Sequence, residues 1–112
     1  MAANYDITIE QGATFTFSVT VTAINLTGYT ARMQGRTSHA SADKVFNLTS
    51  SGGGLTVTAA TNSIILVTIS ATATTAIAAP SSGVYDLEIE SGSGVVTRLL
   101  QGTYQVTPEV TR

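Results

Sequence analysis

The sequence predicts an all-β protein, an immunoglobulin-like antiparallel β-sandwich of seven to nine strands with one short helical turn near residues 71–77. Three observations support this prediction. Apolar and polar residues alternate along most of the chain, and turns rich in glycine and serine separate the alternating stretches. The length of 112 residues suits one domain. We therefore expect residues 1–112 to form a single sandwich around one core.

The first third of the chain has the most regular alternation. Residues 14–22 read TFTFSVTVT, which predicts a strand with phenylalanine and valine on one face and hydroxyl residues on the other. Residues 5–9 alternate in the same way, and Gly12 separates these two strands. A turn signal at residues 25–28 precedes a third predicted strand, residues 29–36.

The middle of the chain is less regular. Residues 44–48 predict a short edge strand, and residues 55–57 begin another. Residues 63–69 (SIILVTI) are apolar on both faces, which is typical of a central or covered strand. We expect either the opposite sheet together with a helix, or another protein, to cover it, because an exposed strand of this kind is prone to aggregate. Residues 70–79 predict one or two helical turns, because the segment opens with a serine that can cap a helix and a proline follows it.

The last third predicts a β-hairpin. Residues 82–90 form one strand, residues 91–94 (SGSG) the turn, and residues 95–106 a return strand that we expect to be bent by a bulge at Gly102. The predicted core collects the inward-facing side chains of all these strands. It consists of Ile7, Ile9, Phe15, Phe17, Val19, Tyr29, Ala31, Met33, Ile65, Val67, Tyr85, Leu87, Ile89 and Leu99.

The composition excludes several classes of protein. The chain has no cysteine, which excludes disulfides, thiolate zinc sites and cysteine nucleophiles. A net charge of -2 with five basic residues argues against nucleic-acid binding. The longest apolar run, residues 64–67, is too short to span a membrane, and the first residues do not resemble a secretory signal. We therefore expect a protein made in the cytoplasm that binds neither nucleic acid nor membrane.

Charged residues are scarce. They make up 11% of the chain, against about 25% in typical domains. Because free monomers rely on surface charge for solubility, this scarcity favours a protein whose surface is largely covered by partners. The alternative is a soluble monomer with threonine-rich strands, since threonine suits exposed strand positions.

No residue pattern predicts catalysis. The single histidine, His39, lies in a polar loop between Ser38 and Ser41, neither of which sits in a nucleophile-elbow sequence. The acidic residues of 86–90 stand about 7 Å apart in a row on one strand face, rather than on opposite sides of a cleft. No loop has the spacing of an EF-hand. We expect no enzymatic activity, no small-molecule substrate, and no catalytic, cofactor-binding or metal-binding residues.

The acidic row has a structural interpretation. In an immunoglobulin-like sandwich the strand from residue 29 lies beside the strand from residue 84, which in turn lies beside the return strand. Polar and charged side chains of the three strands then form one charged stripe: Arg32, Gln34, Arg36, Asp86, Glu88, Glu90 and Arg98. Opposite charges across strands contribute about 0.2–1 kcal/mol each. The stripe is either a solvated face that fixes strand register or a docking face.

Four segments of the chain carry a resemblance to a known group of proteins: YDITIEQGATF, LTGYTARMQGR, SGVYDLEI and the ending VTRLLQGTYQVTPEVTR. Together, and in this order, they resemble short virion proteins of tailed bacteriophages with an immunoglobulin-like sandwich. They are similar, more distantly, to the N-terminal domain of upper baseplate proteins that carry the receptor-binding tips. The resemblance implies a virion component near the tail, baseplate or fibre attachment point, and it brings no catalytic residue with it.

Three functional hypotheses follow. The first is a structural component of a tailed phage that docks at the tail, neck or baseplate and supports fibre attachment through β-surface contacts. Its partners would be other virion proteins and copies of itself, with the N-terminal strand and residues 109–112 as docking segments. The second is a capsid decoration protein, which would have a higher copy number. The third is a carbohydrate-binding module, which would need exposed aromatic side chains.

Overall fold

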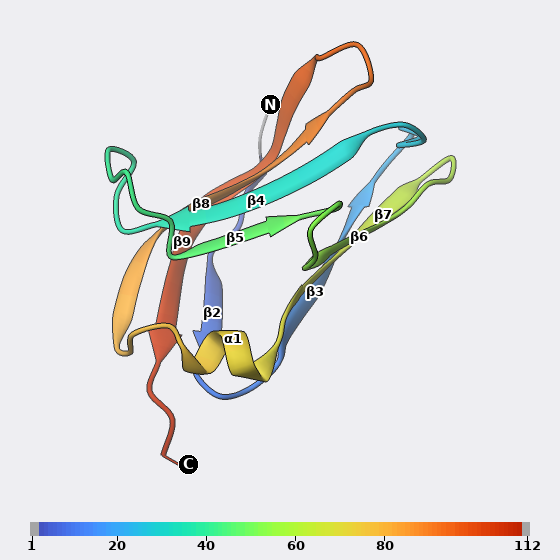
Figure 1. Cartoon of the computed structure of the whole chain (residues 1–112). Coiled ribbons are helices and arrows are strands. Elements are labelled where there is room, and N and C mark those ends of the chain that lie inside the picture. The colour runs from blue at the N-terminus through green and yellow to red at the C-terminus, as the bar shows by residue number, and fades with distance from the viewer. Residues whose placement is uncertain (1–2, 111–112) are drawn as a thin grey trace.

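The computed structural model describes residues 3–110 and consists of two β-sheets packed face to face, with one short helix at an end of the sandwich (Figure 1). Its elements, in chain order, are β1 (Ala3–Asn4), β2 (Ile7–Glu10), β3 (Phe15–Val21), β4 (Thr30–Arg36), β5 (Phe46–Thr49), β6 (Leu55–Thr58), β7 (Ser63–Ile69), α1 (Ala71–Thr75), β8 (Ser81–Glu90) and β9 (Val96–Thr107).

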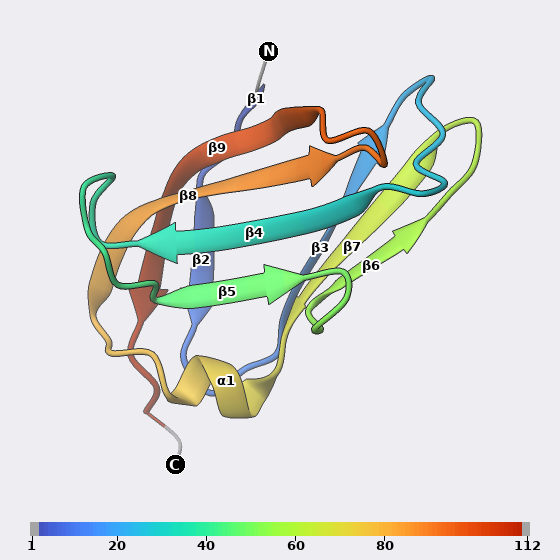
Figure 2. The same cartoon turned by 45° about the horizontal axis from the view of Figure 1, so that its top comes forward.

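The strand order confirms the predicted fold class. The larger sheet has the order β1-β9-β8-β4-β5, with β2 also paired to β9, and the smaller sheet has the order β3-β7-β6. In an immunoglobulin variable domain one sheet contains strands A-B-E-D and the other G-F-C-C′-C″, so β9-β8-β4-β5 corresponds to G-F-C-C′ and β3-β7-β6 to B-E-D. β1 and β2 run parallel to β9, whereas every other strand pair in residues 3–110 is antiparallel. Figure 2 shows the two layers from a second angle.

The core lies between the sheets and is wholly apolar at its centre. Met33 on β4 pairs with Leu87 on β8, and both side chains are fully buried. Ile65 and Val67 of β7, in the smaller sheet, belong to the same core cluster and are equally buried. Each such side chain contributes about 1.5–3 kcal/mol when it leaves water. Further buried side chains, absent from the sequence prediction, are Val21, Leu26, Phe46, Leu55, Ile69, Ile77, Leu100, Tyr104 and Val106.

Five predicted core residues are only partly buried: Phe15, Phe17, Val19, Tyr29 and Leu99. The first three lie on β3, which is an edge strand of the smaller sheet. Their side chains point toward the core but remain half-open at the side of the sandwich. The direction of these side chains was predicted correctly, but the extent of their burial was not. Alternation shows which face of a strand is apolar, and it does not show whether the strand lies at the centre or the edge of a sheet.

The predicted bulge at Gly102 is wrong. The irregularity in the β8–β9 ladder lies between Leu87 and Glu88, which pair with Leu100 and Arg98 and leave Leu99 as the extra residue. Because side chains alternate with a period of two, the extra residue shifts the inward row. Leu100 is therefore buried in place of the predicted Leu99.

Gly102 allows the N-terminal segment to lie close to β9. A Cβ atom at this position would collide with the backbone carbonyl of Tyr5. The hydroxyl of Tyr85, which pairs with Gly102 across the ladder, donates a hydrogen bond to that same carbonyl. Burial raises the pKa of Tyr85 to about 12. Tyr5 and Asp6 belong to no strand, so the predicted strand over residues 5–9 begins only at Ile7, as β2, and β1 precedes it.

Two buried hydroxyl groups hold loops to the sandwich. The Ser63 hydroxyl accepts hydrogen bonds from the backbone N–H groups of Leu26 (3.0 Å) and Ala60 (3.2 Å) and lies 2.9 Å from the Ile24 carbonyl oxygen, to which it can donate. The Thr74 hydroxyl accepts from the Gly12 N–H at 3.1 Å. Both side chains are completely buried, so each anchors a connection between strands that the alternation leaves unspecified.

The helical prediction is confirmed. α1 begins after Ser70, whose side chain accepts a hydrogen bond from the backbone N–H of Ala73 as an N-cap. The helix is short and packs at the end of the sandwich rather than over a sheet face (Figure 1). No helix within residues 3–110 is both long and apolar enough to cross a membrane.

Candidate functional site

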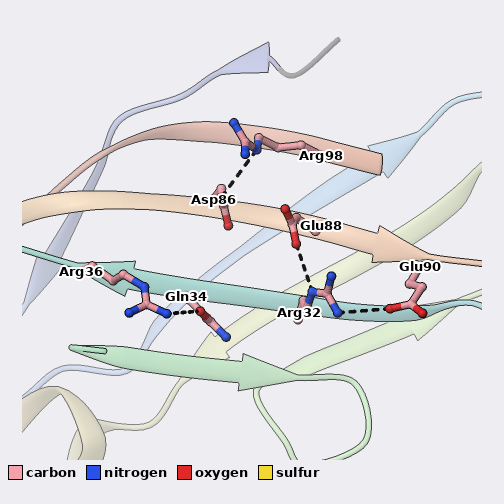
Figure 3. Close-up of polar contacts among 7 residues, drawn as sticks. All are labelled: Arg32, Gln34, Arg36, Asp86, Glu88, Glu90 and Arg98. Atoms are coloured by element: carbon pink, nitrogen blue, oxygen red, sulfur yellow. Dashed lines mark hydrogen bonds and ion pairs between the residues drawn. The ribbon is translucent and has the colours of Figure 1, made fainter. Parts of the chain in front are cut away.

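The charged stripe lies on the outer face of the larger sheet, as predicted (Figure 3). Arg32 on β4 forms ion pairs with Glu88 at 3.0 Å and with Glu90 at 3.1 Å, both on β8. Asp86 pairs with Arg98 on β9 at 3.5 Å. These contacts bridge the three neighbouring strands β4, β8 and β9, so the stripe connects the strands that build this face.

The protonation of the stripe follows from its contacts. The hydrogen bond to Glu88 raises the pKa of Arg32, and the nearby charges of Glu88 and Glu90 add to this effect. Burial raises the pKa of Asp86, and repulsion by Glu88 acts in the same direction. Arg98 and Arg32 oppose that rise. The three ion pairs are partly exposed to solvent, which limits each to about 0–1 kcal/mol.

Arg36 differs from the other basic residues of the stripe. Its guanidinium donates hydrogen bonds to the Ser41 and Ala42 carbonyl oxygens at 2.8 and 2.9 Å and to the Gln34 side-chain oxygen at 3.1 Å. No acidic side chain in residues 3–110 forms an ion pair with it. Its role in this structure is therefore to hold the loop after β4 against the sheet.

A shallow hollow of about 460 Å³ lies at one end of the stripe. Its lining includes Arg36 and His39, Asp86 on β8, and Arg98 and Thr103 on β9. The hollow is lined by polar and apolar groups in equal measure, including Val84 and the buried ring of Tyr85.

His39 lies in the loop after β4, between Ser38 and Ser41. None of the hydrogen bonds within residues 3–110 joins His39 to Ser38 or Ser41, and the Ser41 hydroxyl lies near the Asp43 carbonyl oxygen instead, at 3.4 Å. Within the same part of the chain, no group of three or more histidine or acidic side chains is placed to hold a metal ion.

The outer face of the smaller sheet has a different character. Ile64 and Leu66 point outward from its central strand, β7, and are 43% and 42% exposed. Residues of β3 and β6 pair with them and present threonine and serine: Ser18, Thr20, Thr56 and Thr58. Neither β3, β6 nor β7 contains a charged residue. We call this surface, made by Ile64, Leu66 and these four residues, the neutral face.

The neutral face resolves an alternative raised by the sequence. The apolar run of residues 63–69 predicted either a central strand or one covered by another element. β7 is central, between β3 and β6, but no part of the described chain covers its outer face. The central position of β7 was predicted correctly. Its exposed outer side chains leave a surface that a partner can cover.

The predicted docking segment at the N-terminus is bound to the sandwich, and the one at the C-terminus is bound at Glu109. β2 pairs with β9 over four residues and buries Ile7 and Ile9. At the other end, Glu109 donates its backbone N–H to the Gln11 side chain at 3.1 Å, and Val110 is exposed. Residues 111–112 lie outside the described residues.

No family model matches the chain, and no curated protein matches it. The functional argument therefore rests on the surfaces described above and on the resemblance drawn from the sequence.

Proposed function

We propose that the chain is a structural component of a tailed bacteriophage particle and has no catalytic activity. It docks at the tail, neck or baseplate and supports fibre attachment, in contact with other virion proteins and with copies of itself. The observation that carries the proposal is the neutral face, where Ile64 and Leu66 stand exposed among hydroxyl residues without a charge. Exposed apolar side chains on a surface without charge are typical of protein contacts.

The hollow and the charged stripe support the same class of function. The ion pairs stiffen the larger sheet, and the hollow offers hydrogen-bonding groups without a deep cavity. A carbohydrate-binding module is a weaker reading, because carbohydrate sites present exposed aromatic rings. Among residues 3–110 only the ring of Tyr5 is exposed, and it packs against Phe17 with ring centroids 5.6 Å apart.

The test is incorporation into particles. A tagged copy, expressed during infection by the phage that encodes it, is expected to co-purify with particles and to label the tail, neck or baseplate in electron micrographs. Tens of copies or fewer per particle fit this position, whereas hundreds on the head would instead indicate the capsid decoration protein. Absence from purified particles would reject the proposal.

Paired variants test the neutral face. The double substitution I64K/L66K places two charges on it, and both side chains are exposed, so the sandwich is expected to fold normally. We expect incorporation to fall by about tenfold or more, because each buried unpaired charge is costly. The matched control, V95K/V96K, changes two exposed valines near the β8–β9 turn and should leave incorporation unchanged.

A further inference from the structure

The edge of the smaller sheet formed by β3 lacks the features that usually prevent strand pairing between molecules. Natural edge strands are short, charged, interrupted by proline or bulged. β3 is seven residues long, contains neither charge nor proline, and pairs with β7 without a register shift. The other edge strands of the described chain are shorter: β5 and β6 have four residues each, β2 has four and β1 has two.

The inner side of this edge is incompletely covered. Phe15, Phe17 and Val19 point toward the core yet are only partly buried. The ring of Tyr5, which is 50% exposed, lies against Phe17 at the same side of the sandwich. An additional strand placed beside β3 would continue the sheet and cover these four side chains. The energetic gain is the burial of apolar surface together with a new ladder of backbone hydrogen bonds.

The sequence of β3 indicates which strand fits there. It reads FTFSVTV, and its pattern is the same in both directions around Ser18. In an antiparallel pairing of two copies centred on Ser18, each phenylalanine faces a valine on the inner side. On the outer side Thr16 faces Thr20, and Ser18 faces its own counterpart. Aromatic residues opposite β-branched residues are favourable cross-strand pairs, and no like charges meet.

We infer that β3 pairs with β3 of a second copy of this chain, across a two-fold axis at Ser18, to give a continuous six-stranded sheet. Such a contact is isologous and closes on itself, so it yields a dimer rather than a fibre. The inference deepens the proposed function, which includes copies of the chain among its partners. It can nevertheless be tested on the purified protein without any particle.

The first experiment is sedimentation velocity on the full chain over a range of concentrations. The native protein is expected to form dimers. S18K adds an exposed lysine that faces its counterpart across the axis, so we expect the dissociation constant to rise by about tenfold or more. The control T56K adds a lysine to the outward face of β6, the opposite edge of the same sheet, and should leave the dimer unchanged.

Each result decides the inference. A native protein that stays monomeric at millimolar concentration overturns it. A dimer that S18K leaves intact, or that T56K weakens equally, also overturns it, because the contact would then lie at another edge or across the neutral face. Circular dichroism and urea unfolding of both variants show that the fold is retained, so loss of the dimer is not confused with unfolding.

The second experiment reads the register directly, because the chain has no cysteine of its own. Opposite residues of an antiparallel pair have Cα atoms about 4.5–5.5 Å apart, which suits a disulfide. S18C should therefore oxidise to a covalent dimer. T20C should remain largely monomeric under the same conditions, since it faces Thr16 of the second copy. Equal cross-linking of the two variants would overturn the proposed register.

The dimer and the proposed function can fail separately. A monomeric native protein that still enters phage particles would remove the dimer and leave the proposed function intact. A protein that dimerises through β3 but is absent from particles would remove the proposed function and leave the dimer intact.

Discussion

The hydroxyl group of Ser63 is predicted to stabilise the sandwich more than any exposed side chain. Ser63 lies at the start of β7, is fully buried, and contacts two loops at once. Replacing it by alanine removes the acceptor for the buried Leu26 N–H and for the Ala60 N–H, and it removes a donor for the Ile24 carbonyl. The alanine methyl group occupies nearly the same volume, so little cavity is created.

The magnitude follows from the groups left without a partner. A buried donor or acceptor that loses its partner costs about 1–3 kcal/mol. Leu26 is itself buried, so its N–H bears the full cost, whereas the Ala60 and Ile24 groups lie nearer to solvent and recover part of it from water. We therefore expect S63A to lower the free energy of unfolding by about 2–4 kcal/mol. For a domain of this size that corresponds to a fall in Tm of about 8–16 °C.

Urea unfolding followed by circular dichroism measures this change. The control is S82A, on an exposed residue of β8 whose side chain makes no hydrogen bond in the described chain; its effect should stay within about 0.5 kcal/mol. Hydrogen exchange gives a local readout, since the Leu26 amide should exchange faster in S63A. A loss below about 1 kcal/mol, or unchanged protection of that amide, would refute the reasoning.

Three further predictions concern the side chains around β9. Tyr104→Phe removes a buried hydroxyl that has no hydrogen-bond partner in the described chain, so urea unfolding should show stability unchanged or raised by up to about 1 kcal/mol; a clear loss would reveal a partner. Gly102→Ala places a Cβ against the Tyr5 backbone and should cost about 1–3 kcal/mol, while Gly92→Ala, whose added Cβ approaches only one atom at 3.8 Å, should cost less than about 0.5 kcal/mol. The pKa of Tyr85 is raised to about 12 in the folded protein, so the unfolded chain loses this proton first as the pH rises above 10. The contribution of Tyr85 to stability is therefore complete below pH 10 and is lost as the pH rises toward 12. A pH titration of the free energy of unfolding should show this decline, and Tyr85→Phe should make the decline less steep.

Most of the fold was predictable because alternation marks both the strands and the direction of their side chains. The pairing of Arg32 with Glu88 and of Asp86 with Arg98 followed from placing three predicted strands side by side. The ion-paired part of the charged stripe therefore needed no information beyond the sequence and a known sandwich topology.

What could not be predicted depends on contacts between distant segments. The bulge at Leu99 reverses the inward row of β9, and no turn residue marks it. The roles of Ser63 and Gly102 arise from groups 37 and 97 residues away in sequence, Leu26 and Tyr5. Apolar side chains such as Leu26 in connecting segments have no alternating neighbours, so periodicity gives no signal for their burial.

The parallel pairing of β2 with β9 has a consequence for biosynthesis. Ile7 aligns with Tyr104 and Ile9 with Val106, so the first core strand takes its place only after β9 has been made. Ile7 and Ile9 therefore remain exposed to water until β9 has been synthesised. The pairing of β2 with β9 joins segments far apart in the sequence, so it has a high contact order. We expect the hairpin of β8 and β9 to form before the N-terminal strand joins it.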